Sequence, residues 1–146
     1  MATGNPRWYH STAALLRDGR VLTAGGDFSG PYQAHTAQIF KPDYLDNTPD
    51  RAVIGSPVPT ERVYGAHLTF NYSHPTERAV SKACLIKLGA VTHSFNQDQR
   101  YVPLTVVNQQ AGVNVELAFP SGHPSVHLAP PGHYFLFILT QNTPGG

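Results

Sequence analysis

Apolar and polar residues alternate in short segments near the start of the chain, with turn-forming residues between them. Ser11–Leu16 and Arg20–Ala24 flank Asp18-Gly19, a dipeptide that favours a two-residue type I′ turn, because both central positions of that turn need positive φ. This pattern predicts a β-hairpin over residues 9–26 that stops at Gly25-Gly26. His35–Phe40 alternates apolar and polar residues and predicts a third strand.

The second part of the chain carries five further strand candidates, separated by turn signals such as Pro130-Pro131-Gly132. Short strands at this regular spacing favour a β-sandwich of immunoglobulin-like type. The last candidate is apolar on both faces, which predicts a central strand covered on both sides. The five segments are Gly65–Tyr72, Val80–Leu88, Val102–Val107, Val113–Phe119 and Tyr134–Thr140.

A segment rich in proline, aspartate and small residues, Lys41–Pro59, separates the two groups of strands and predicts a domain boundary. The three N-terminal strands with their Gly-Gly stop resemble part of a propeller blade. The predicted fold is therefore all-β, with a partial β-propeller blade in residues 1–48 and an immunoglobulin-like β-sandwich in residues 49–146.

Composition agrees with a turn-rich β protein. The chain is 40% hydrophobic and 13% charged, with 13 glycines and 13 prolines, which argues against disorder. A net charge of +1 gives no reason to expect nucleic acid or an anionic membrane as a partner. No run of 18 apolar residues predicts a membrane span, and the first residues do not form a signal peptide. A single cysteine, Cys84, excludes an internal disulfide.

Two histidines stand beside polar residues where strand ends or loops are expected. Tyr9 directly precedes His10, and His93 lies in the segment Thr92–Arg100. Two imidazoles and a phenol are a ligand set for a copper ion, because imidazole nitrogen suits borderline metals such as copper and zinc. From the residues alone, a lone histidine is more often a hydrogen-bonded structural residue than a metal ligand, and Tyr9 could be a packing aromatic.

Four segments in a fixed order resemble one family, the copper-radical oxidases that include galactose oxidase and glyoxal oxidase. The chain is similar to their C-terminal part, from Pro6 to Asn142. This resemblance implies a last kelch-type propeller blade followed by an immunoglobulin-like early-set (E-set) domain. The four matching segments are Pro6–Leu22 with Gly25-Gly26, Ala37–Leu45, Thr92–Leu104 and Ala129–Phe137.

The resemblance also implies a copper site. Tyr9 would be the axial ligand and the catalytic base, and His10 and His93 would be the two imidazole ligands of Cu²⁺. The family's fourth ligand is a tyrosine cross-linked to a cysteine, and that pair holds a radical. No segment of this chain matches the pair, and Cys84 falls in a predicted strand where the family has an ordinary strand residue.

The implied activity is oxidation of a primary alcohol or aldehyde by O₂, which yields H₂O₂. The resemblance implies small-molecule alcohol, aldehyde or carbohydrate substrates, an upstream propeller as partner and an extracellular location. It also implies a final strand beyond this sequence. Alone, the chain is expected to be inactive as an oxidase, because it lacks the radical pair.

Two alternatives remain open. One is a carbohydrate- or cell-wall-binding module that stacks sugars on Trp8, Phe28 and Tyr32. The other is a truncated chain with no function of its own.

Overall fold

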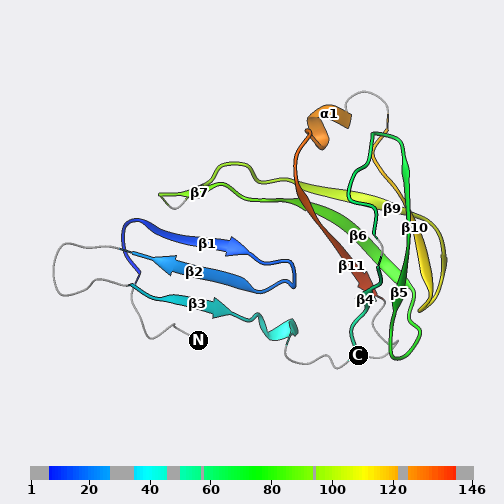
Figure 1. The fold of residues 1–146 in the computed structure, drawn as a ribbon, viewed down its shortest axis with the longest axis horizontal. Coiled ribbons are helices and arrows are strands. Elements are labelled where there is room, and N and C mark those ends of the chain that lie inside the picture. The colour runs from blue at the N-terminus through cyan, green and yellow to red at the C-terminus, as the bar shows by residue number, and fades with distance from the viewer. Residues whose placement is uncertain are drawn as a thin grey trace. The chain divides into compact units, whose positions relative to one another are not determined.

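The computed structural model describes residues 7–26, 35–45, 50–56, 58–93, 95–121 and 125–140. Strands are the main elements in this part of the chain (Figure 1), which confirms the predicted all-β fold. Two short helical pieces accompany them, the 3₁₀ turn η1 (Asp43–Leu45) and the helix α1 (Ser125–Leu128). The chain divides into two compact units. Unit 1 contains residues 1–48 and 88–99, and unit 2 contains residues 49–87 and 100–146.

Unit 1 contains a three-stranded antiparallel sheet in the order β1-β2-β3, formed by Ser11–Leu15, Val21–Gly25 and Ala37–Phe40. All three strands were predicted. Two more strands, β7 (Val91–Thr92) and β8 (Phe95–Asn96), pair as a small hairpin, and β7 lies beside β1 (Figure 1). The sequence did not predict this hairpin, because two-residue strands carry too few positions to show alternation.

The turn between β1 and β2 differs from the predicted one. The amide of Leu16 donates to the carbonyl of Arg20 at 2.8 Å, so the loop has three residues instead of two. Gly19 has a φ of 88°, whereas Asp18 does not have a positive φ. A three-residue loop needs a left-handed residue only at its end, so the type I′ prediction is wrong. The hydrogen bond from the Arg20 amide, with the guanidinium beside it, holds the pKa of Asp18 below its ordinary value.

Unit 2 is built on a six-stranded sheet in the order β11-β6-β9-β10-β5-β4. All five strands predicted for this part of the chain are present, with ends that shift by a few residues. Only β4 was not predicted. The strands are β4 (Val53–Ile54), β5 (His67–Ser73), β6 (Val80–Lys87), β9 (Tyr101–Gln110), β10 (Asn114–Ala118) and β11 (Tyr134–Thr140).

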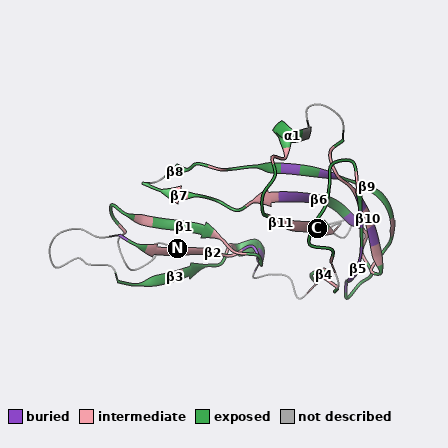
Figure 2. Ribbon diagram, turned by 45° about the horizontal axis from the view of Figure 1, so that its top comes forward, coloured by how far each residue is buried: buried purple, intermediate pink, exposed green. Residues whose placement is uncertain are grey.

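The ten-residue strand β9 joins the two halves of this sheet. Its first part, Tyr101–Leu104, pairs with β6, and its later part pairs with β10. Alternate residues of β5, β9 and β10 form one core with residues of β6, and these strands carry buried stretches, purple in the ribbon of Figure 2. Val115 and Leu117 of β10 are fully buried. Each such side chain contributes about 1.5–3 kcal/mol relative to an exposed one, so β10 anchors the sandwich.

The position of β11 corrects one prediction. It pairs with β6 alone among the described strands and stands at the end of the sheet order. Six of its seven residues are half-buried and one, Leu139, is exposed. The prediction of a central strand covered on both faces is therefore wrong. A continuous apolar run does not by itself distinguish a central strand from a strand at the end of a sheet.

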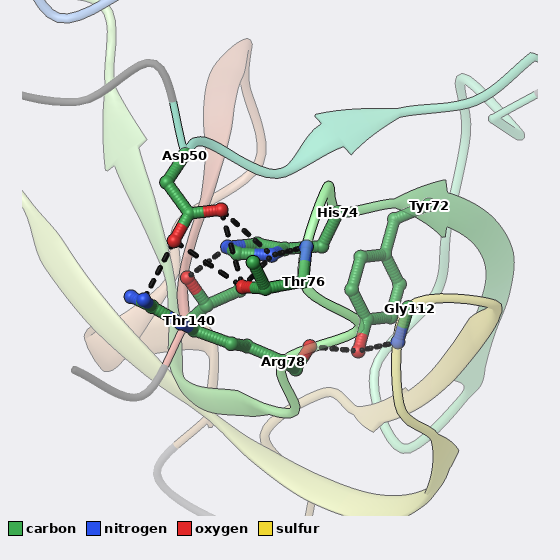
Figure 3. Close-up of polar contacts among 7 residues, drawn as sticks. All are labelled: Asp50, Tyr72, His74, Thr76, Arg78, Gly112 and Thr140. Atoms are coloured by element: carbon green, nitrogen blue, oxygen red, sulfur yellow. Dashed lines mark hydrogen bonds and ion pairs between the residues drawn. The ribbon is translucent and has the colours of Figure 1, made fainter. Parts of the chain in front are cut away.

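A polar cluster, formed by Asp50, His74, Thr76, Arg78 and Thr140 around the buried side chain of His74, joins distant segments of unit 2 (Figure 3). The side chain of His74 has no exposed surface, and both its ring nitrogens have partners. The Thr76 amide lies 3.2 Å from Nδ1, and the Thr140 hydroxyl lies 3.2 Å from Nε2. Asp50 accepts from Thr76 at 3.1 Å and forms an ion pair with Arg78 at 2.6 Å. The cluster thus ties the segment before β4 to the end of β11.

We expect Asp50→Ala to lower the free energy of unfolding by about 1 kcal/mol, because it removes a carboxylate that accepts from the exposed Thr76 hydroxyl and pairs with the half-buried Arg78 beside the buried His74. Urea unfolding followed by circular dichroism measures the change. The exposed Glu61→Ala is the matched control, and we expect it to stay within about 0.5 kcal/mol of the parent chain. Equal stability of the two variants would contradict a stabilising role for the cluster.

Cys84 lies on β6 and is only 4% exposed. Burial raises the pKa of its thiol, an effect that a hydrogen bond with Tyr101 partly offsets. Because the thiolate is the reactive form, both burial and the raised pKa make this cysteine inert in the folded chain.

We therefore expect Cys84 to react with a thiol reagent at least about tenfold more slowly in the folded chain than in denaturant, both at about pH 8. Absorbance of the released thiol product follows the reaction. Fast labelling without denaturant would show that β6 is accessible.

Candidate metal centre

Tyr9 and His10 lie at the corner of a tight turn just before β1. The Ser11 amide donates to the Trp8 carbonyl at 3.1 Å and closes this turn. His10 has a φ of 64°, whereas Tyr9 does not have a positive φ. This is the sign pattern of a type II turn, whose third position usually holds glycine or asparagine. A histidine held in a left-handed conformation is unfavourable, and such residues concentrate at functional sites.

His93 occupies a similar corner in the hairpin formed by β7 and β8. Thr92 pairs with Phe95, so His93 is the first residue of a two-residue loop. Such loops require positive φ at their first position, and His93 has a φ of 49°. The Ala90 amide donates to the Asn96 side chain at 3.1 Å, and the Gln97 amide donates to Ala90, which together fasten the base of the hairpin.

The structure brings the rings of Tyr9, His10 and His93 together within unit 1, although 82 positions separate the two histidines in sequence (93 minus 10, less one). The centroids of the two imidazoles are 5.2 Å apart. The Tyr9 ring lies 4.2 Å from that of His10 and 5.2 Å from that of His93. All three side chains are exposed, so the cluster forms an open corner instead of a buried core.

Two glycines at the end of β2 allow the segment that carries Tyr9 and His10 to approach. A Cβ on Gly26 would lie 2.8 Å from the Trp8 nitrogen, and one on Gly25 would lie 2.9 Å from the His10 carbonyl oxygen. Arg7 fixes the same segment from its other end. Its guanidinium donates to the Gly25 carbonyl at 2.8 Å and to the Thr36 carbonyl at 3.0 Å. Gly25-Gly26 is therefore a contact surface for the candidate site as well as a strand terminator.

We expect Gly26→Ala to destabilise the chain by about 1–3 kcal/mol, because its φ of 103° is unfavourable for alanine and its Cβ would displace the Trp8 backbone. Urea unfolding measures the loss, and nuclear magnetic resonance shifts of Tyr9 and His10 report the displacement. Ala24→Gly, two positions earlier in β2, is the control for general loosening of the strand. Unchanged shifts in Gly26→Ala would contradict the close approach.

The three rings fit a copper ion by chemistry and spacing. An ion about 2 Å from one nitrogen of each imidazole leaves the ring centroids no more than about 6 Å apart, and the measured separation lies within that limit. No three histidine, cysteine, aspartate or glutamate side chains gather as a metal cluster within the described ranges. The phenol of Tyr9 lies beside both imidazoles, and two imidazoles with a phenol are a candidate ligand set for copper.

Residues 51–146 match the family described as "Galactose oxidase-like, Early set domain". The chain belongs to this family. The match covers most of unit 2 and the hairpin that carries His93. It confirms the predicted resemblance to the C-terminal part of galactose oxidase and glyoxal oxidases and the immunoglobulin-like sandwich.

Relatives of this E-set chain extend the match across both units. It is 34% identical over 137 residues to the galactose oxidase of Gibberella zeae, which covers 92% of this chain and 20% of the relative. It is 33% identical over 150 residues to the aldehyde oxidase GLOX of Vitis pseudoreticulata, covering 95% of this chain and 28% of the relative.

A solved fungal alcohol oxidase of the AA5 family, in complex with copper, has a similar structure. The TM-score is 0.77 with 28% sequence identity, and the match covers 97% of this chain and 30% of that one. This E-set chain therefore spans less than a third of the length of each of these proteins.

Two of the three residues proposed for sugar stacking cannot be assessed from the described part of the chain. Trp8, the first proposed sugar-stacking residue, is 54% exposed, whereas Phe28 and Tyr32 lie outside the described residues. The carbohydrate-binding alternative therefore stays a prediction. None of the helices in the described ranges has the length and hydropathy of a membrane span.

Sequence analysis missed Arg7 and Thr92. Arg7 supports the turn that carries Tyr9 and His10, and the Thr92 hydroxyl lies 2.6 Å from the Nδ1 atom of His93. Both residues lie within segments that resemble the family, Pro6–Leu22 and Thr92–Leu104, but no role was predicted for either. Their hydrogen bonds depend on tertiary contacts or on rotamers, however, and composition and spacing carry no signal for either.

Proposed function

We propose that this chain supplies the copper-binding corner of a copper-radical oxidase that oxidises a primary alcohol or aldehyde with O₂. Tyr9, His10 and His93 would hold the ion. The observation that carries this proposal is the convergence of these three rings at centroid distances of 4.2–5.2 Å. The copper complex of the AA5 alcohol oxidase and the oxidase names of the relatives support it.

Copper, when bound, would take one of the two electrons that leave the substrate. His10 and His93 would act as neutral nitrogen donors, and neutral imidazoles leave the charge of the ion available to attract a substrate hydroxyl. The Tyr9 phenolate would accept the hydroxyl proton as general base, because it is held next to both donors. The open exposure of the three rings leaves room for a substrate to approach the ion.

The complete reaction removes two electrons and two protons from the alcohol, and O₂ takes up both pairs to leave as H₂O₂. One copper ion accepts a single electron, so a second acceptor is required. In this proposal a cross-linked tyrosine–cysteine radical on an upstream kelch-type propeller provides it. Cys84 is not part of that pair, because it is buried in the core strand β6. The same proposal locates the whole oxidase outside the cell.

The proposal is tested by Cu(II) titration of the purified chain followed by electron paramagnetic resonance, beside the double variant His10→Ala/His93→Ala. We expect one tetragonal copper per chain with couplings to two nitrogens, and loss of that signal in the variant. His133→Ala/His127→Ala is the matched control, since both are exposed histidines that belong to unit 2, and it should retain the signal. Added alcohol should yield no H₂O₂ from this chain alone, because the radical acceptor is absent.

Copper binding that survives His10→Ala/His93→Ala would contradict the ligand assignment. Substantial H₂O₂ production by the isolated chain would contradict the need for an upstream radical pair. Each outcome concerns a different part of the proposal. Copper binding tests which residues are ligands, and H₂O₂ production tests whether the chain can catalyse the reaction alone.

A further inference from the structure

The hairpin corner that carries His93 contains a short hydrogen bond between neighbouring side chains. The hydroxyl oxygen of Thr92 lies 2.6 Å from Nδ1 of His93. We infer that Thr92 is a positioning residue for His93: its oxygen accepts the Nδ1 proton, which leaves Nε2 as the nitrogen that binds a metal. This inference rests on the proposed function for its metal, but the hydrogen bond itself can be tested without one.

An exposed imidazole on a tight turn has little packing to fix its ring. His93 is exposed, and its neighbours on the ring side are Tyr9 and His10, which are exposed as well. Without a further constraint, the ring would sample several rotamers and lose that freedom only on binding a ligand. A hydrogen bond to a neighbouring side chain removes part of that freedom in advance, which favours binding.

Thr92 is suited to hold the ring because its own position is fixed. It belongs to β7, and its backbone pairs with Phe95 of β8. As a β-branched residue it has a restricted χ1, so its hydroxyl is directed by the strand instead of rotating freely. The left-handed φ of His93 turns the chain sharply at the next residue. The pairing of β7, the restricted χ1 of Thr92 and the turn at His93 together place the Thr92 oxygen beside Nδ1 of His93.

The direction of this hydrogen bond corresponds to one of the two neutral forms of the imidazole, because the Thr92 hydroxyl can accept from Nδ1–H or donate to an unprotonated Nδ1. In the inferred direction Thr92 accepts, since Thr92 already occupies Nδ1 and Nε2 is the nitrogen left to bind a metal. A neutral ring carries one proton, and the nitrogen without it is the metal donor. If Nδ1–H donates to Thr92, Nε2 keeps its lone pair. Metal-binding histidines commonly donate their other N–H in this way, and removal of such a partner lowers metal affinity about 10–100-fold.

The tautomer is measured on the metal-free, ¹⁵N-labelled chain by two-bond ¹H–¹⁵N correlation spectra at about pH 8.5, where histidines are neutral. We expect His93 to be protonated at Nδ1 in the parent chain and in Thr92→Ser, which keeps the hydroxyl. We expect Thr92→Val, which keeps the branched shape, to shift the population toward the Nε2–H form. Thr69→Val, at an exposed position of β5, is the matched control and should leave His93 unchanged.

Cu(II) titration then measures the consequence for binding. We expect Thr92→Val to raise the Kd about tenfold or more, and Thr92→Ser and Thr69→Val to stay near the parent value. Circular dichroism and urea unfolding confirm that each variant is folded.

Predominant Nε2–H tautomer in the parent chain, or spectra of His93 that do not change in Thr92→Val, would overturn the inference. Failure of the parent chain to bind copper through its histidines would instead overturn the proposed function. In that case the metal-free spectra still decide whether Thr92 positions His93.

Discussion

The close approach of the backbone of residues 7–11 to Gly25-Gly26 is the constraint on which the candidate site depends. A side chain on either glycine would overlap backbone atoms of Trp8 or His10. This approach lets the Trp8–Ser11 turn form against β2, and Arg7 holds it there by donating to the Gly25 carbonyl. The candidate site is therefore shaped by main-chain packing, and Tyr9 and His10 are exposed residues at its corner.

Both candidate histidines pay a conformational cost for their place in the fold. Each has a left-handed φ, and each occupies a turn position where glycine or asparagine is more favourable. A tight turn nevertheless has an advantage for a ligand, because it projects the side chain away from the strands that fix its backbone. Two independent turns, one before β1 and one between β7 and β8, deliver their imidazoles to the same corner.

The hairpin with His93 lies in sequence between β6 and β9, two strands of the unit 2 sheet, although its residues belong to unit 1. The same chain segment therefore serves both units. The buried residues of β10 and the polar cluster around His74 stabilise the sheet that contains β6 and β9, the strands on either side of this hairpin in sequence.

The sequence by itself determined the strand pattern, the all-β class and the identity of the candidate ligands, because alternation and distinctive motifs are local properties. It did not determine the three-residue turn at Gly19 or the end position of β11, since loop register and sheet order depend on pairing with distant strands. Only the tertiary structure decided that Tyr9, His10 and His93 meet, and that Arg7 and Thr92 support them. Those contacts join residues more than eighty positions apart, or depend on side-chain rotamers, and neither is encoded in local spacing.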